Sequence, residues 1–158
     1  MINIENFISQ HITFRKESFF FNVIEANEAK LREGIQGKSV LVIGGGGTIG
    51  SSFIRELLRF EPGALVVVDI SENYLTELTR DLRSRYGLKV PETYITYPIN
   101  FGEPVFDRVL ERYGPFDIVA NFAAHKHVRS EKDHYSVTAL LENNILKAES
   151  LLNKLSKN

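Results

Sequence analysis

The sequence predicts an α/β fold in which helices cover both faces of a parallel β-sheet. From Lys38 onward, short runs of β-branched residues alternate with longer segments of helical periodicity, which is the pattern of successive βαβ units. Most of the short runs are almost continuously apolar, as in strands that are buried on both faces. With 158 residues, the chain has the length of one ordinary domain.

The short apolar runs predict the strands. They are Ser39–Ile43, Ala64–Asp69, Thr93–Tyr97 and Phe116–Asn121. The third run is more polar than the others and is followed by Pro98, so we expect it at an edge of the sheet. Units of this kind predict a doubly wound sheet with the strand order 3-2-1-4.

Each strand is followed by a segment with apolar residues at helical spacing. These segments predict helices over residues 49–60, 71–86, 103–113 and 133–155. Gly and Pro residues end the first three, and Ser71 is placed to cap the second.

Residues 1–37 form an N-terminal extension to the domain that we expect over residues 38–158. The extension carries several phenylalanines, and residues 25–35 have helical periodicity. Two roles are open, a helix packed on the core or an arm that binds a partner. The tendency of apolar faces to be buried within their own chain favours the first.

Composition excludes several classes of function. The 19 Lys and Arg residues balance 20 Asp and Glu residues, so no basic field attracts nucleic acid or anionic lipid. Without cysteine there is no disulfide, catalytic thiol or thiolate metal site, and the histidines at 125, 127 and 134 lack the fixed convergence of a zinc site. No segment reaches the roughly 18 apolar residues of a membrane span, and no signal peptide is apparent, so we expect a cytoplasmic protein.

A glycine-rich turn directly follows the first strand. It reads Gly44-Gly45-Gly46-Gly47-Thr48-Ile49-Gly50, and an amphipathic helix follows it. This context predicts a Rossmann-type dinucleotide site, whereas a P-loop is excluded because its lysine pattern has no match. Gly44 permits the tight turn, Gly47 lets the backbone approach a pyrophosphate, and Gly50 lets the helix pack close to the sheet.

Asp69 ends the second strand, nineteen residues after Gly50. At this position a carboxylate accepts hydrogen bonds from the adenosine ribose. Its charge would repel a 2′-phosphate, and the residues that follow, Ile70-Ser71-Glu72, offer no cation to neutralise one. The predicted cofactor is therefore NAD, and NADP is less favoured.

The end of the fourth strand is expected beside this cofactor, because ligands of such sheets bind where the strand order reverses. The sequence there is Phe122-Ala123-Ala124, whose small side chains let the backbone pass close to a dinucleotide.

Together, the glycine turn, Asp69 and the run Ala123-Ala124-His125-Lys126-His127-Val128 resemble the extended short-chain dehydrogenase/reductases. The strongest likeness is to the capsular-polysaccharide nucleotide-sugar 4,6-dehydratases, whose fourth strand ends in the specific pattern A-A-x-K-H-V. Asn144 is similar to the asparagine of that family's N-V-x-G-T helix. The likeness covers about residues 36 to 152.

The resemblance implies NAD as cofactor and a nucleotide sugar as substrate, with Lys126 and His127 on the substrate side. Asn100 stands where the family has an aspartate near adenine, and its amide oxygen can still accept from the adenine amino group. Lys147 replaces a glycine, and Ile43 replaces a threonine. The expected cofactor-binding residues are Gly44, Gly47, Thr48, Ile49, Gly50, Asp69, Ile70, Asn100, Phe101, Phe122, Ala123 and Ala124.

The catalytic dyad of the resembled family is missing. Its Y-x-x-x-K motif uses a lysine and the cofactor to lower the pKa of the tyrosine, but none of the six tyrosines here is followed four residues later by lysine. We therefore assign no catalytic residue and expect the cofactor-binding front part of a longer dehydratase, inert by itself. The alternatives are a fragment of a nucleotide-sugar 4-epimerase and a non-catalytic NAD-binding module.

The fourth strand is apolar enough to be covered, yet no fifth strand follows it in this sequence. An unpaired strand edge is normally paired or covered. The N-terminal extension and the same edge of a second copy are the candidates, and we favour the second copy, which predicts a homo-oligomer.

Overall fold

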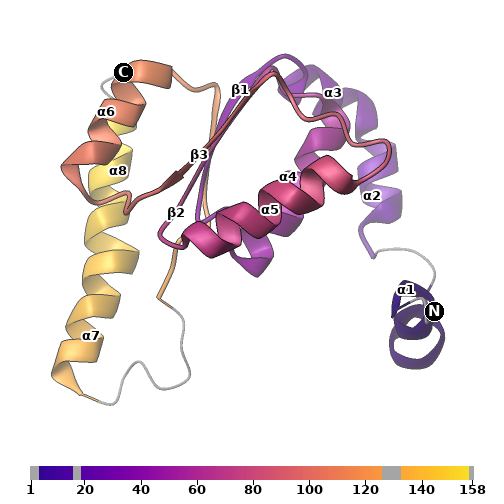
Figure 1. Ribbon diagram of the computed structural model, residues 1–158, viewed down its shortest axis with the longest axis horizontal. Coiled ribbons are helices and arrows are strands. Elements are labelled where there is room, and N and C mark those ends of the chain that lie inside the picture. The colour runs from indigo at the N-terminus through magenta and orange to yellow at the C-terminus, as the bar shows by residue number, and fades with distance from the viewer. Residues whose placement is uncertain (1–3, 16–18, 126–132, 157–158) are drawn as a thin grey trace. The chain divides into compact units, whose positions relative to one another are not determined.

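The structure is a computed structural model that describes residues 4–15, 19–125 and 133–156 (Figure 1). The chain divides into two compact units, Met1–Gly34 and Ile35–Asn158. The first unit contains short helical segments, namely α1 (Ile4–Ile8), a π-helical turn (Ser9–Thr13), α2 (Phe21–Ala26) and most of α3 (Glu28–Ile35). Asn27 separates α2 from α3, and its side-chain amide donates to the Val23 carbonyl at 2.8 Å. The helix expected over residues 25–35 is therefore divided in two.

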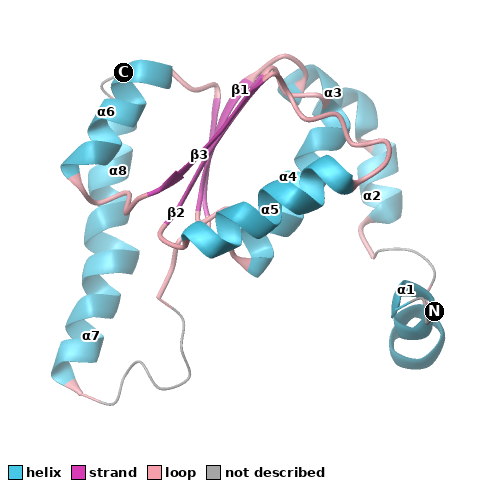
Figure 2. Cartoon of the chain, in the orientation of Figure 1, coloured by secondary structure: helices cyan, strands magenta, loops and turns pink. Residues whose placement is uncertain are grey.

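The second unit is built on a parallel β-sheet, whose strands are drawn in magenta in Figure 2. Its four strands lie in the order β3-β2-β1-β4. Its elements are β1 (Ser39–Ile43), α4 (Thr48–Leu57) with a 3₁₀ turn (Leu58–Phe60), β2 (Ala64–Asp69), α5 (Glu72–Ser84), β3 (Thr93–Pro98), α6 (Pro104–Tyr113), β4 (Ile118–Asn121), α7 (His134–Leu141), a π-helical segment (Glu142–Leu146) and α8 (Lys147–Leu155). The strand order expected from the sequence is confirmed, and the polar strand β3 lies at an edge.

Helices cover both faces of this sheet (Figure 1). Successive strand residues point to opposite faces, so neighbours in β1 belong to different halves of the core. Val42 packs in one cluster with residues of α4 and α5, among them Ile54. Ile43 packs in the other with Phe106 of α6 and Leu151 of α8. Helices packed against both faces fix the position of the sheet, and with it the positions of the loops at the strand ends.

Strand β4 begins at Ile118, two residues later than the sequence predicts, and the side chain of Asp117 just before it contacts β1. The Asp117 carboxylate accepts from the Ser39 amide at 2.8 Å and from the Ser39 hydroxyl at 2.9 Å. These hydrogen bonds lower the pKa of Asp117 from its ordinary value of 3.8. The contact holds the amino ends of β1 and β4 together.

Side chains that accept hydrogen bonds from backbone amides mark where two of the helices begin. The Ser71 hydroxyl accepts from the Tyr74 amide at 3.3 Å, as the sequence predicts for the cap of α5. The Asp133 carboxylate accepts from the Ser136 amide at 2.8 Å at the start of α7. No helix within the described residues is both long and apolar enough to cross a lipid bilayer.

Candidate dinucleotide-binding site

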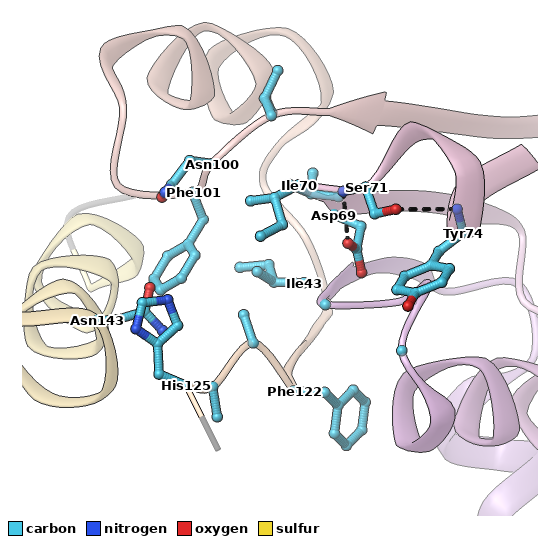
Figure 3. Close-up of a pocket in the computed structure, with 16 residues that line it drawn as sticks. Ile43, Asp69, Ile70, Ser71, Tyr74, Asn100, Phe101, Phe122, His125 and Asn143 are labelled. Atoms are coloured by element: carbon cyan, nitrogen blue, oxygen red, sulfur yellow. Dashed lines mark hydrogen bonds between the residues drawn. The ribbon is translucent and has the colours of Figure 1, made fainter. Parts of the chain in front are cut away.

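The carboxyl ends of all four strands open onto one pocket of about 270 Å³ (Figure 3). It extends from the end of β4 past β1 and β2 to the end of β3, so it includes the point where the strand order reverses. Nine of the residues expected from the sequence line it: Gly44, Gly47, Asp69, Ile70, Asn100, Phe101, Phe122, Ala123 and Ala124.

The glycine turn brings the loop after β4 against the end of β1. Gly44 has a φ of 75°, which favours glycine, and its amide donates to the Val68 carbonyl at 2.7 Å. A Cβ at Gly44 would lie 2.5 Å from the Ala123 nitrogen. At Gly50 a Cβ would lie 2.2 Å from the Gly44 carbonyl oxygen. Both positions therefore require glycine for close approach of two backbone segments.

Gly47 differs from these two glycines because the protein leaves space at its side-chain position. It is the N-cap of α4, with extended backbone, and a Cβ there would meet only the Gly44 oxygen, at an ordinary 3.5 Å. Among the residues that the structure describes, no side chain caps the N-terminus of α4. The free N–H groups of the first helical turn and the helix dipole make this end of the helix able to bind an anion.

The Asp69 carboxylate is held in place by two backbone amides. Its Oδ2 accepts from the Gly46 amide at 2.9 Å, and its Oδ1 accepts from the Ser71 amide at 3.0 Å. A carboxylate oxygen has a second lone pair, so both oxygens can accept further hydrogen bonds from a ligand. Figure 3 shows Asp69 beside Tyr74 on one side of the pocket, opposite Asn143 and His125.

At the β3 end of the pocket, Asn100 contacts Lys147. The Asn100 Oδ1 accepts from the Gly102 amide at 2.9 Å and from the Lys147 ammonium at 3.4 Å. The lysine stem lies over Gly102, where a Cβ would approach the lysine Cδ to 2.7 Å. Asn100 and Lys147, the two departures from the family pattern, are 47 positions apart in the sequence, and the fold brings them into contact.

Asn144 holds the chain after β4. Its Oδ1 accepts from the His125 amide at 2.8 Å, and its Nδ2 donates to the His125 carbonyl at 3.0 Å. The neighbouring Asn143 is buried and lines the pocket. Both asparagines lie in the π-helical segment, whose wider turn breaks the regular α-helical spacing of side chains.

The remaining sequence-predicted residues do not line this pocket. Thr48 lines a separate hollow with Arg55, Ile49 is 65% exposed, and Gly50 is buried against Gly44. The apolar periodicity of residues 49–60 predicts Ile49 on the inner face of its helix with Ile54 and Leu57, and this prediction is wrong because Ile49 is exposed in the first turn of α4. Lys126 and His127, expected on the substrate side, lie outside the described residues.

Sequence reasoning missed seven residues of the pocket: Ile43, Val68, Ser71, Tyr74, Ile99, His125 and Asn143. Ser71 and Tyr74 could have been found, since a cap at Ser71 places the first turn of α5 immediately beyond Asp69. Asn143 could not have been found from the sequence. It lies in the π-helical segment with Asn144, and regular α-helical spacing would not direct both side chains to one site. In the described part of the chain, no three His, Asp or Glu side chains gather as a metal site would need.

The strand, glycine turn and helix, with an acidic residue at the end of the next strand, define the chain as a Rossmann-type domain of the dinucleotide-binding class. The family model described as "Polysaccharide biosynthesis protein" matches residues 40–158. The chain therefore belongs to the polysaccharide biosynthesis protein family.

Curated relatives and a solved structure agree with this family. The chain is 29% identical over 105 residues to the "Probable polysaccharide biosynthesis protein EpsC" of Bacillus subtilis, covering 66% of the chain and 17% of the relative. It is 27% identical over 123 residues to the capsular polysaccharide biosynthesis protein CapD of Staphylococcus aureus, covering 78% of the chain and 20% of the relative. The chain thus spans about a fifth of the length of these relatives.

Among solved structures, the enzyme WbmF of Bordetella bronchiseptica, in complex with NAD+ and UDP, has a similar fold. The TM-score is 0.53 at 23% identity, and the match covers 77% of this chain and 32% of that one.

Proposed function

We propose that this chain is the NAD-binding part of a nucleotide-sugar 4,6-dehydratase that acts on a UDP-N-acetylhexosamine in surface-polysaccharide biosynthesis, in the cytoplasm. The observation that carries the proposal is a pocket lined both by Gly47, the N-cap of α4, and by Asp69. One group suits a pyrophosphate and the other suits ribose hydroxyls. The family membership supports the sugar-nucleotide part of the proposal.

The lining of the pocket also predicts how the proposed cofactor is oriented. With the pyrophosphate at α4 and the ribose on Asp69, the adenine would extend toward Ile70 and Asn100, because β3 lies beyond β2 in the sheet. The nicotinamide half would then lie toward Ala123 at the end of β4. Bound NAD would supply the hydride chemistry at the sugar. The residues of this chain would bind it, orient it and hold the loop after β4 through Asn144.

The first test is the choice between NAD and NADP. We expect calorimetric titration of the chain to show at least about tenfold tighter binding of NAD, since the Asp69 charge repels a 2′-phosphate. Asp69→Ser should narrow this preference to less than about threefold, because it removes the charge. Glu77→Gln, which removes a 71% exposed carboxylate of α5, should leave the preference unchanged. Equal affinity of the unaltered chain for both cofactors would contradict the role given to Asp69.

A second test concerns catalysis. Mixed with NAD and a UDP-N-acetylhexosamine, the chain should form no 4-keto-6-deoxy sugar, because its sequence holds no Y-x-x-x-K dyad to act as base. Mass spectrometry of the sugar nucleotide after long incubation measures the product. Detectable conversion would show that another group in the chain serves as the base.

The proposal includes residues 1–37 as an extension, residues 38–158 as the cofactor domain, and a homo-oligomer. Among the described residues, β4 pairs with β1 on one side and with no strand on the other, which leaves an edge for a second copy. A 4-epimerase would use the same pocket and differ in the product formed. A non-catalytic NAD-binding module would bind the cofactor without a role in sugar chemistry.

A further inference from the structure

The orientation of the Asn100 amide is fixed by its surroundings. Both groups that contact its oxygen, the Gly102 amide and the Lys147 ammonium, can only donate hydrogen bonds. The opposite amide orientation would direct the NH₂ group at two donors, so it is excluded. The two lone pairs of the Asn100 oxygen are thus already engaged by the protein.

The amide nitrogen of Asn100 is therefore the polar atom that remains for a ligand. No hydrogen bond from this nitrogen to another described residue occurs, and Asn100 lines the pocket at its β3 end. A cation on the amide oxygen also polarises the group and strengthens donation from its NH₂. Lys147 has no carboxylate within 4.0 Å in the described part of the chain, so its charge is not neutralised by an ion pair.

We infer that Asn100 recognises the cofactor base by donating a hydrogen bond from its side-chain NH₂ group. The sequence instead leads one to expect that the Asn100 oxygen accepts from the base. This inference rests on the proposed function, because it takes a dinucleotide base to lie at the β3 end of the pocket. The adenine edge offers an amino group, which donates, and the ring nitrogen N1, which accepts. Asn100 would contact N1. A purine base without the 6-amino group keeps N1 as an acceptor and satisfies Asn100 as well.

The test compares two cofactors that differ only at this edge, NAD and its analogue in which purine, without the 6-amino group, replaces adenine. The unaltered chain should bind both within about twofold, because both bases keep N1 as the acceptor for Asn100. Asn100→Asp keeps an oxygen for Gly102 and Lys147 and turns an acceptor toward the pocket. We expect this variant to prefer NAD by about tenfold, because its carboxylate can accept from the 6-amino group, which the purine analogue lacks.

A matched control separates base recognition from the added charge. Asn153→Asp places the same negative charge on an exposed position of α8, and it should leave the ratio of the two affinities unchanged. A thermal unfolding curve for each variant confirms that it is folded.

The outcomes distinguish the inference from the function on which it rests. If the unaltered chain binds NAD and already prefers it tenfold over the analogue, the Asn100 oxygen accepts from the amino group. That result overturns the inference alone. An unchanged ratio in Asn100→Asp overturns it as well. If neither dinucleotide binds, the proposed function fails, and the inference fails with it.

Discussion

Replacing Gly47 by valine is expected to weaken NAD binding strongly while leaving the fold intact. The protein itself leaves room at this position, since the nearest atom to a Cβ would be the Gly44 oxygen at 3.5 Å. The backbone at Gly47 is extended, with φ −67° and ψ 168°, which any residue adopts. In the proposed complex, the space is filled by the pyrophosphate, so a side chain there would displace it from the first turn of α4.

The expected loss of affinity is on the order of a hundredfold. It corresponds to the loss of about two charge-assisted hydrogen bonds of roughly 1.5 kcal/mol each. Calorimetric titration measures the affinity, and the melting temperature should stay within about 2 °C because the substitution meets open space.

Gly34→Val is the matched control for this substitution. Gly34 lies in α3 and has no atom within 4 Å of a built Cβ, and it does not line the pocket. It should therefore leave NAD affinity unchanged. Full affinity in a folded Gly47→Val protein would show that the pyrophosphate does not lie on this turn.

The parts of the fold that the sequence predicts well are those set by local pattern. The apolar runs of β1 and β2 match their strands residue for residue, because strands buried on both faces need an unbroken apolar sequence. The strand order is predictable because successive βαβ units connect with the same handedness. The role of the glycine turn is predictable because the first strand-to-helix turn of such a sheet binds phosphate.

The parts that the sequence does not predict depend on contacts between distant residues. Asn100 and Lys147 are 47 positions apart, and only the fold brings the ammonium to the amide oxygen. Sequence reasoning therefore kept the oxygen free for adenine, although the protein occupies it. The hydrogen bonds between Asp117 and Ser39, which are 78 positions apart, are a second contact that only the fold reveals.

Replacing Gly50 by alanine is expected to produce the opposite result to Gly47→Val, with a large loss of stability. The added Cβ would lie 2.2 Å from the Gly44 oxygen and 2.8 Å from the Gly45 Cα. Both are backbone atoms of the turn that joins β1 to α4, so they cannot move aside as a flexible side chain would. Either α4 shifts away from the sheet, which opens the core around Ile54, or the turn is distorted.

The free energy of unfolding should fall by about 3 kcal/mol, at the upper end of the usual cost of overpacking. In a domain of this size such a loss lowers the melting temperature by roughly 6–12 °C. Chemical denaturation followed by circular dichroism measures the change, and Gly47→Ala, the same substitution three positions earlier, should cost less than about 1 kcal/mol. Similar losses in the two variants would mean that α4 does not depend on the close contact between Gly50 and Gly44. A large loss in Gly50→Ala alone would show that one glycine holds the helix to the sheet while the other leaves space for the ligand.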